Sequence, residues 1–146
     1  MSLSLDDLDR ALLARLQAHA RESTAELARR LHVARTTVVA RLARLEAGGV
    51  ITGYTVRLAS EQAEGVQAFV NLAVSPKSAR KVIDRLSGIP ELRQLAAVSG
   101  EFDYIAILRA PNTQRLDALL DEIGEIDGVL RTTTSVLLAM RVDRVA

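Results

Sequence analysis

The sequence has no cysteine and very few aromatic side chains. Its 146 residues contain no Cys and no Trp, and Phe, Trp and Tyr together make up 3%. The absence of cysteine excludes disulfide scaffolds, Cys-based zinc sites and thiol nucleophiles. Since apolar residues nevertheless reach 49%, the core must consist of aliphatic side chains. The length allows one domain or two small ones.

Long apolar runs are also missing. None reaches the roughly 18–20 residues that a bilayer-spanning helix needs. The N-terminal segment MSLSLDDLDR is acidic and has neither the basic region nor the apolar region of a secretory signal. We therefore expect a cytoplasmic protein without membrane association.

Residue clusters that would indicate catalysis or metal binding are scarce. The two histidines, His19 and His32, have no carboxylate or second histidine at ligand spacing. The S-x-x-K spacing of Ser78 and Lys81 lacks the further motifs of serine acyl enzymes. The glycine-rich stretch 48–53 lacks the lysine and the strand-to-helix context of a phosphate loop. We expect no metal, no cofactor and no enzymatic activity.

Positive charge is concentrated in one short segment, although the net charge of the whole chain is only +1. Residues 21–44 contain six Arg and two Glu, whereas residues 56–146 contain eleven Lys or Arg and twelve Asp or Glu. A local excess of arginine is a weak electrostatic indication of nucleic-acid binding.

The N-terminal third predicts helices separated by short turns. A stripe of leucines at helical spacing predicts a first helix from Leu5 to about His19, with acidic residues in its first turn. Ser23 and Glu26 have capping-box spacing, which predicts a second helix that ends near Leu31. The leucines of the first stripe are Leu5, Leu8, Leu12 and Leu16.

A third helix is predicted between about residues 35 and 47. Val38, Leu42 and Leu45 form its apolar face, and Gly48 and Gly49 end it, because glycine accepts the left-handed conformation of a C-cap. Residues 50–54 then have the composition of a short β-hairpin. Three helices followed by a hairpin predict a winged helix-turn-helix domain over residues 1–54.

The faces of this third helix outside the apolar stripe carry Arg, Thr and Ala. The ordinary interpretation is a solvated helix surface, and the functional one is a DNA-reading helix. Its N-terminal end would meet base edges, and Arg35, Arg41 and Arg44 would pair with phosphates. We therefore expect Arg41→Ala to weaken binding to all sequences and to lower the salt dependence by about one ion. The predicted DNA contacts are Arg35, Thr36, Thr37, Ala40, Arg41 and Arg44.

A linker is predicted over residues 55–65, and the periodicity changes beyond it. Residues 66–146 predict the order β-α-β-β-α-β, with strands at 66–74, 92–99, 104–109 and 129–141 and helices at 76–86 and 114–126. This order predicts a ferredoxin-like domain, so that the fold class is α+β. Apolar residues lie on both faces of the strands, and an open apolar face predicts a homodimer or a larger homo-oligomer.

A turn between the second and third strands carries two carboxylates, Glu101 and Asp103, on either side of Phe102. They could hold the ammonium group of a zwitterion, whose carboxylate the N–H groups of the turn would take. The alternative is a polar hairpin tip that needs Gly and Asp for its geometry. The hydroxyl residues 132–135 are ordinary strand composition or one wall of a site.

The whole chain resembles the Lrp/AsnC family of bacterial and archaeal transcriptional regulators. The resemblance rests on LDDLDRALLARLQAHAR, TAELARRLHV and TTVVARLARLEAGGVITGYTV, and on VSGEFDYIAILRA and IDGVLRTTTSVLL. It implies a winged helix-turn-helix, a C-terminal RAM (regulation of amino-acid metabolism) domain, dimers that often assemble into tetramers or octamers, and an amino-acid effector. The implied effector residues are Gly100, Glu101, Phe102, Asp103, Tyr104, Thr132 and Thr134.

Three positions depart from the family pattern. Ala34 stands where many members have Ser, His32 where many have Gly, and Glu101 where Asp is commoner. The loss of a serine N-cap costs about 1 kcal/mol unless Thr36 or Thr37 replaces it. Two other functions share this fold: a siroheme-decarboxylase-like enzyme, which would need histidines in the C-terminal half, and an assembly module without DNA binding.

Overall fold

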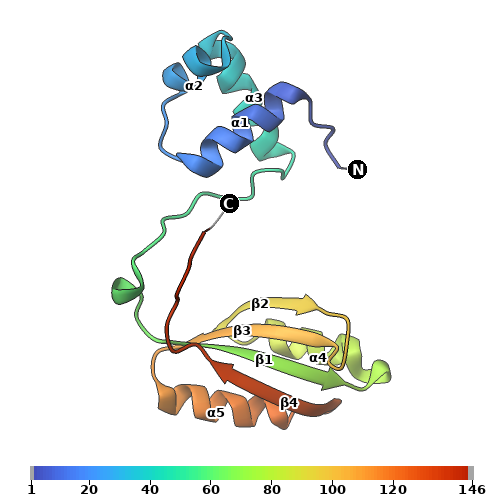
Figure 1. Ribbon diagram of the computed structural model, residues 1–146. Coiled ribbons are helices and arrows are strands. Elements are labelled where there is room, and N and C mark those ends of the chain that lie inside the picture. The colour runs from blue at the N-terminus through green and yellow to red at the C-terminus, as the bar shows by residue number, and fades with distance from the viewer. Residues whose placement is uncertain (1, 145–146) are drawn as a thin grey trace. The chain divides into compact units, whose positions relative to one another are not determined.

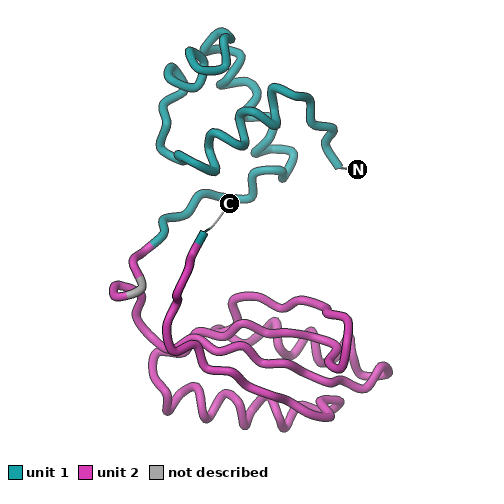
Figure 2. Tube along the Cα trace, in the orientation of Figure 1, with its two compact units in different colours: residues 1–57, 144–146 teal, residues 58–143 magenta. Residues whose placement is uncertain are grey.

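The computed structural model describes residues 2–144, apart from the side chain of Ser60. The chain divides into an N-terminal unit, residues 1–57 with 144–146, and a C-terminal unit, residues 58–143 (Figure 2). Each unit has its own cluster of buried apolar side chains. No helix within residues 2–144 is long and apolar enough to cross a bilayer.

The N-terminal unit consists of α1 (Asp7–Ala18), α2 (Thr24–Leu31) and α3 (Arg35–Ala47) (Figure 1). These are the three helices predicted from the apolar periodicity. Its core contains the residues expected on the inner faces, with Leu8, Leu16 and Leu42 half-buried at its margin. The fully or almost fully buried residues are Leu12, Leu27, Ala28, Val38 and Leu45.

The helix starts differ in how their free N–H groups are satisfied. Ser23 caps α2 as predicted, by accepting from the N–H of Glu26 at 3.1 Å. The Glu26 carboxylate does not complete a box, because Arg29 and Arg30 occupy it. A full capping box, which was not predicted, begins α1, where Asp6 and Asp9 each accept from the other's N–H. Ala34 leaves α3 without a side-chain cap, as expected.

The turn between α2 and α3 places a non-glycine residue in a conformation that favours glycine. His32 has φ 55° and ψ 42°, the left-handed region, and is the non-glycine residue with positive φ among residues 2–144. A side chain in this region costs roughly 1–2 kcal/mol, because Cβ crowds the following carbonyl oxygen. The helix-turn-helix therefore contains a strained residue at its turn.

We expect His32→Gly to raise the free energy of unfolding of the N-terminal unit by about 0.5–1 kcal/mol. The substitution removes the free-energy cost of a side chain in the left-handed region, which stabilises the folded state. Glycine also loses more backbone entropy on folding, and this loss cancels part of the gain. Urea unfolding measures it. His19→Gly is the matched control, because His19 has φ −143° and should gain nothing. An equal effect at both positions would contradict the strain at His32.

The predicted hairpin at residues 50–54 is wrong: no strand lies between Ala47 and Val66 in the described chain. The N–H groups of Val50 and Ile51 both donate to the carbonyl of Leu45, so this segment continues the turn that ends α3. Their side chains pack at the margin of the helical core. Gly49, with φ 72°, provides the left-handed residue expected at the helix end. The unit is therefore a helix-turn-helix without a wing.

The C-terminal unit has the predicted order β-α-β-β-α-β. Its elements are β1 (Val66–Val74), α4 (Ala79–Ser87), β2 (Leu92–Ala97), β3 (Tyr104–Ala110), α5 (Thr113–Gly124) and β4 (Val129–Val136), with 3-10 turns at Ser60–Gln62 and Pro76–Ser78. The four strands pair antiparallel in the order β2-β3-β1-β4 (Figure 1). The α+β fold class is confirmed.

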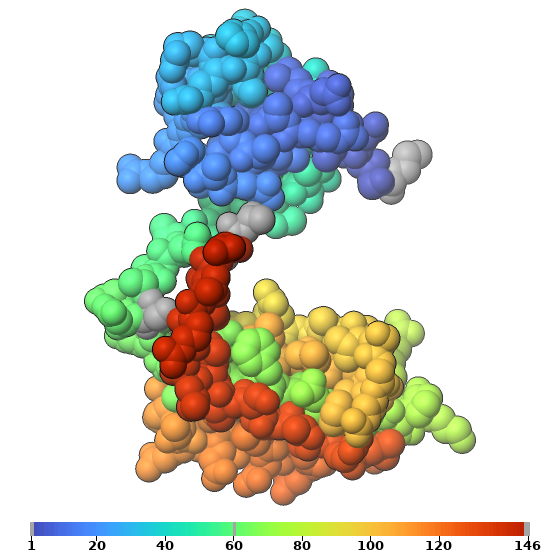
Figure 3. All heavy atoms as spheres, viewed as in Figure 1, coloured from blue at the N-terminus to red at the C-terminus, as the bar shows by residue number. Residues whose placement is uncertain are grey.

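Both helices cover one face of this sheet. Leu72 and Val70 of β1 are fully buried there together with Val82 of α4 and Leu119 of α5. No helix within residues 58–143 covers the opposite face, and Figure 3 shows side chains of the strands on it. Phe69 and Ile107 lie on this face, but Asn71 of β1 and Thr133 and Ser135 of β4 are polar, so the open face is less apolar than expected.

The last strand ends at Val136 rather than near Arg141. Its partner β1 begins at Val66, and the N–H of Leu137 makes the last bond, to the carbonyl of Gln67 at 2.8 Å. Beyond this point only Val66 of β1 remains in the register of the antiparallel ladder. The apolar end of the predicted strand therefore lies outside the sheet, and Leu138 is 93% exposed.

Candidate nucleic-acid interface and effector turn

One face of α3 is exposed along its whole length. Thr36, Val39, Ala40 and Ala43 are exposed and share the i, i+3, i+4, i+7 spacing of a single helix face. Val39 is a large apolar residue with 49% of its surface exposed, and its neighbours are small. A face of this kind allows the helix to approach another surface closely. Val39 and Ala43 were not among the predicted contacts, although the same helical spacing identifies them.

Arg35 lies at the start of this face. Its Nε donates to Oγ1 of Thr24 in α2 at 3.1 Å, which fixes the direction of the guanidinium. The residue remains exposed, whereas Thr37 is half-buried. The start of α3 therefore presents a cation next to Thr36, on a helix end whose own dipole favours anions.

Arg41 and Arg44 have partners within the unit. Nη1 of Arg41 lies 2.5 Å from Oδ2 of Asp6 and 3.0 Å from Oδ1 of Asp9. Nη2 of Arg44 lies 2.6 Å from Oδ2 of Asp9 and donates to the carbonyl of Ser4 at 3.3 Å. Two of the guanidiniums predicted to pair with phosphates thus hold the first turn of α1.

Asp9 is the centre of this network. Its side chain is completely buried, while the side chains of Arg41 and Arg44 are 28% and 39% exposed. Burial alone would raise the pKa of Asp9, but hydrogen bonds from Arg44, from the backbone of Asp6 and from Arg41 hold this pKa far below its ordinary range. Asp9 therefore stays ionised, and both arginines keep a charged partner.

Acid should unfold the N-terminal unit, because several of its carboxylates have lowered pKa values. A hydrogen bond from Arg29 lowers the pKa of Glu26 from 4.5 to about 2, and a hydrogen bond from Arg15 lowers that of Glu22. Because the folded pKa lies below the unfolded one, this contribution is complete above about pH 4.5 and is lost as the pH falls towards 2.

Methyl NMR of the full chain measures this acid sensitivity separately for each unit. We expect the methyl signals of Leu12 and Leu27 to lose dispersion as the pH falls below about 4.5, towards the folded pKa of about 2 for Glu26. Glu26→Gln should make the transition shallower. An unchanged N-terminal unit at pH 2.5 would contradict the linkage.

In the C-terminal unit, the turn between β2 and β3 is fixed by backbone bonds. Gly100 has φ 113°, and the N–H of Val98 donates to the carbonyl of Asp103 at 2.9 Å. The N–H of Asp103 donates to the carbonyl of Leu72, and its carboxylate accepts from the N–H of Val74 at 2.8 Å. Asp103 therefore anchors the turn to the end of β1.

Glu101 and Phe102 of this turn both contact Arg131 of β4. Nη2 of Arg131 lies 2.7 Å from Oε1 of Glu101, and its guanidinium carbon lies 4.8 Å from the centre of the Phe102 ring. Arg131 was not among the predicted effector residues. A guanidinium at this place can bind a carboxylate, and Glu101 beside it can bind an ammonium group.

Thr132 and Thr134 lie on the other face of the sheet. They pair with Leu72 and Val70, which point towards the helices, whereas Arg131 pairs with Ala73 on the open face. Tyr104, opposite Leu72, also packs against the helix-covered core. The predicted effector residues therefore form two groups on opposite sides of the sheet, and Thr132 and Thr134 do not share a face with Arg131.

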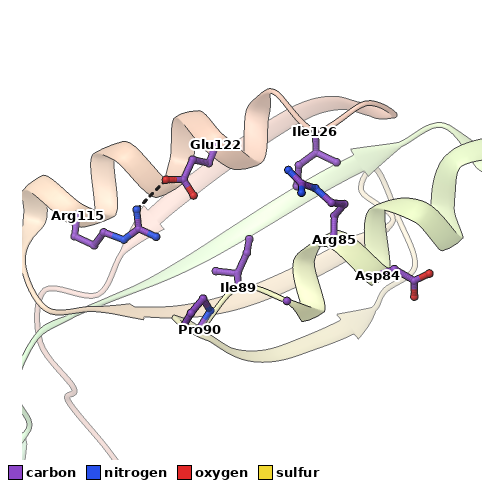
Figure 4. Close-up of a pocket in the computed structure, with 8 residues that line it drawn as sticks. Asp84, Arg85, Ile89, Pro90, Arg115, Glu122 and Ile126 are labelled. Atoms are coloured by element: carbon purple, nitrogen blue, oxygen red, sulfur yellow. Dashed lines mark hydrogen bonds and ion pairs between the residues drawn. The ribbon is translucent and has the colours of Figure 1, made fainter.

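A cleft of about 320 Å³ lies between α4 and α5 (Figure 4). Arg115 is one of its charged lining residues, and Nη1 of Arg115 lies 2.8 Å from Oε1 of Glu122 while its Nε lies 2.6 Å from Oε1 of Glu91. The pair with Glu91 ties α5 to the segment before β2, and the pair with Glu122 lies within α5, so we assign both a structural role. Among residues 2–144, no group of three or more potential ligands could hold a metal ion.

Residues 5–46 match the model of the AsnC-type helix-turn-helix domain, and residues 67–146 match the model of the Lrp/AsnC ligand binding domain. The fold and these two matches define a helix-turn-helix unit of the AsnC type joined to an α+β unit of the Lrp/AsnC ligand-binding type. The chain belongs to the Lrp/AsnC family of transcriptional regulators.

Relatives of known name and structure agree with this membership. The chain is 33% identical to the transcriptional regulator LrpA of Mycobacterium tuberculosis, over 99% of this chain and 97% of that protein. Escherichia coli AsnC shares 25% identity, with a TM-score of 0.82 over 97% of both chains. A Neisseria meningitidis regulator solved as its L-Met complex shares 26% identity, with a TM-score of 0.81 over 96% of this chain and 94% of that one. These names favour a regulator over the decarboxylase-like alternative.

Proposed function

We propose that this regulator reads double-stranded DNA with α3 and changes its DNA binding when it binds an amino acid or a related metabolite. The observation that carries the DNA half is the exposed face of α3, with Arg35 and Thr36 at its start and Val39 and Ala40 in its middle. A major groove admits an α-helix whose N-terminal residues contact base edges. As a DNA-binding protein it would act in the cytoplasm.

The chemistry of the exposed face indicates how bases would be read. Arg35 and Thr36 supply donors for base edges or phosphates at the helix start, while Val39 and Ala40 supply methyl groups for contact with thymine. Thr37 is half-buried and lies at the margin of this face. Arg41 and Arg44 support the helix through their pairs with Asp6 and Asp9.

The effector half is carried by the turn at residues 100–104. Glu101 and Arg131 place an anion and a cation next to each other, which suits the two charged ends of a free amino acid. A ligand of this kind would compete with the Glu101–Arg131 pair for both charges. The L-Met complex of the Neisseria relative supports an amino acid as the class of ligand.

The open sheet face supports self-association. Phe69 and Ile107 pair across β1 and β3 on the face that no helix covers. We propose that a second copy covers this face, giving a homodimer that can assemble further. Two copies would present two α3 helices to a pseudo-palindromic DNA site. Sedimentation of the full chain tests this point: a monomer at micromolar concentration would exclude it.

Genomic SELEX with and without a panel of the twenty amino acids tests the proposed function. We expect enrichment of a pseudo-palindromic sequence, and a change in its affinity with at least one amino acid. Failure to enrich any sequence would contradict the proposal that α3 reads DNA. Enrichment of a sequence whose affinity no amino acid changes would contradict only the proposal that an amino acid is the effector.

A further inference from the structure

We propose that Asp9 is a positioning residue for DNA recognition: it fixes α3 on α1 and keeps Arg41 and Arg44 away from the DNA phosphates. The role assigned to Asp9 rests on the proposed role of α3 as the DNA-reading helix. The evidence is the ion-pair network between the first turn of α1 and the middle turns of α3.

The geometry of this network is fixed from several sides. The reciprocal capping bonds hold Asp6 and Asp9 against each other, at 3.1 and 2.9 Å. Asp9 then binds Arg41 with Oδ1 and Arg44 with Oδ2, so that one carboxylate holds two successive turns of α3. Rotation of α3 about its axis would break both bonds together. The orientation of the exposed face with Thr36 and Val39 therefore depends on Asp9.

The energetics favour positioning over stability as the reason for this network. The desolvation of a buried carboxylate largely cancels its attraction to its partners, so a buried ion pair adds little net stability compared with apolar residues of the same size. Removing one partner is costly, however, because it leaves a charge buried without compensation. An arginine that moved to a phosphate would take away one of the two charged partners of the buried Asp9 carboxylate, so both arginines should stay on α1 when DNA binds.

This assignment changes the expectation for salt dependence. Each phosphate contact steepens the slope of log K against log salt by about 0.9 for duplex DNA. If Asp9 holds Arg44, replacing the carboxylate with an amide removes the charged partner of that guanidinium and leaves its bond to the carbonyl of Ser4, while Arg41 keeps Asp6 as a partner. Asp9→Asn should therefore gain about one phosphate contact. The same change should reduce sequence discrimination, because α3 loses its fixed orientation.

The test compares Asp9→Asn with Asp7→Asn in the full chain. Asp7 lies in the same turn of α1, is fully exposed and pairs with Arg10, so its amide variant makes the same change of net charge without touching α3. The probes are a SELEX-selected duplex and a shuffled duplex of equal length. Binding is measured by fluorescence anisotropy between 50 and about 200 mM salt, the range over which phosphate contacts dominate.

For Asp9→Asn we expect a slope on the shuffled duplex that is steeper by about one, and a selected-to-shuffled affinity ratio that falls about tenfold. Asp7→Asn should match the unaltered protein in both. Equal slopes for the two variants would overturn the proposal, because a merely structural role lowers affinity without adding a phosphate contact.

Arg41→Gln and Arg44→Gln provide a second measurement that does not depend on how Asp9→Asn folds. Both side chains are partly exposed, and we expect the slope to remain unchanged, contrary to the expectation from the sequence for Arg41. A slope lowered by about one in either variant would place that arginine on a phosphate and overturn the proposal. Arg35→Ala tests the role of α3 separately from the role of Asp9. Unaltered DNA binding by this variant would exclude α3 as the DNA-reading helix. If binding is weakened, the salt slopes of the Asp9, Arg41 and Arg44 variants test the role of Asp9.

Discussion

Val39→Glu should lower affinity for the selected DNA site by about 100-fold or more. Val39 lies at the centre of the exposed face of α3, where a helix in the major groove meets base edges. The substitution removes a methyl contact and places a carboxylate among phosphates and base acceptors, which repel it. Fluorescence anisotropy with the selected duplex measures the loss.

The folded state should tolerate this change, because the side chain is 49% exposed and packs little. Circular dichroism and a thermal melt check that point. Ala14→Glu is the matched control: it adds the same charge at an exposed position on α1 and should alter DNA affinity less than threefold. Equal losses in the two variants would show that net charge, rather than the α3 face, controls binding.

The helices and the order of the strands could be predicted because their signals are local. Val38, Leu42 and Leu45 repeat with the period of a helix, and β1 alternates with the period of a strand, so each pattern indicates its own element. The inner faces followed from the same periods. Val82 and Leu86 of α4, for example, are completely buried as their spacing predicts.

The errors arose where structure depends on a distant partner. Residues 50–54 have the composition of a strand, but a strand forms only beside another one, and the carbonyl of Leu45 takes their first N–H groups instead. Residues 137–140 are equally apolar, and β4 stops where β1, which begins at Val66, has at most two residues left to pair with them. Composition contains no information about either limit.

The candidate sites likewise combine features that local sequence patterns predict with contacts between residues far apart in the sequence. The exposed stripe of Thr36, Val39 and Ala40 is local and can be read from helical spacing. The pairs of Arg41 and Arg44 with Asp9 span 32 and 35 positions in the sequence, and the bond between Asp103 and Val74 that anchors the turn spans 29. A helical wheel places Arg41 close to the apolar stripe, and this was the available sign that it faces α1.

Arg131→Ala is a useful companion to substitutions in the turn, because it removes a cation without touching the backbone of the turn. Its guanidinium contacts Glu101 and Phe102, and its side chain is 54% exposed, so the fold should remain intact. If the turn binds the carboxylate of an amino acid, this cation is its natural partner. The comparison separates loss of a ligand contact from loss of turn geometry.

Asp103→Ala should lower the affinity for an amino-acid effector at least tenfold and leave DNA affinity unchanged within twofold. The carboxylate of Asp103 accepts from the N–H of Val74 at 2.8 Å, and its own N–H and carbonyl bond to β1 and to the strand-end residue Val98. Its removal frees the turn that carries Glu101 and Phe102. Calorimetry against the twenty amino acids measures the loss. Asp103→Asn can still accept one hydrogen bond and should keep most of the affinity. Intact effector binding by Asp103→Ala would exclude the turn at residues 100–104 as the site, whereas a parallel loss of DNA binding would show that the C-terminal unit had unfolded.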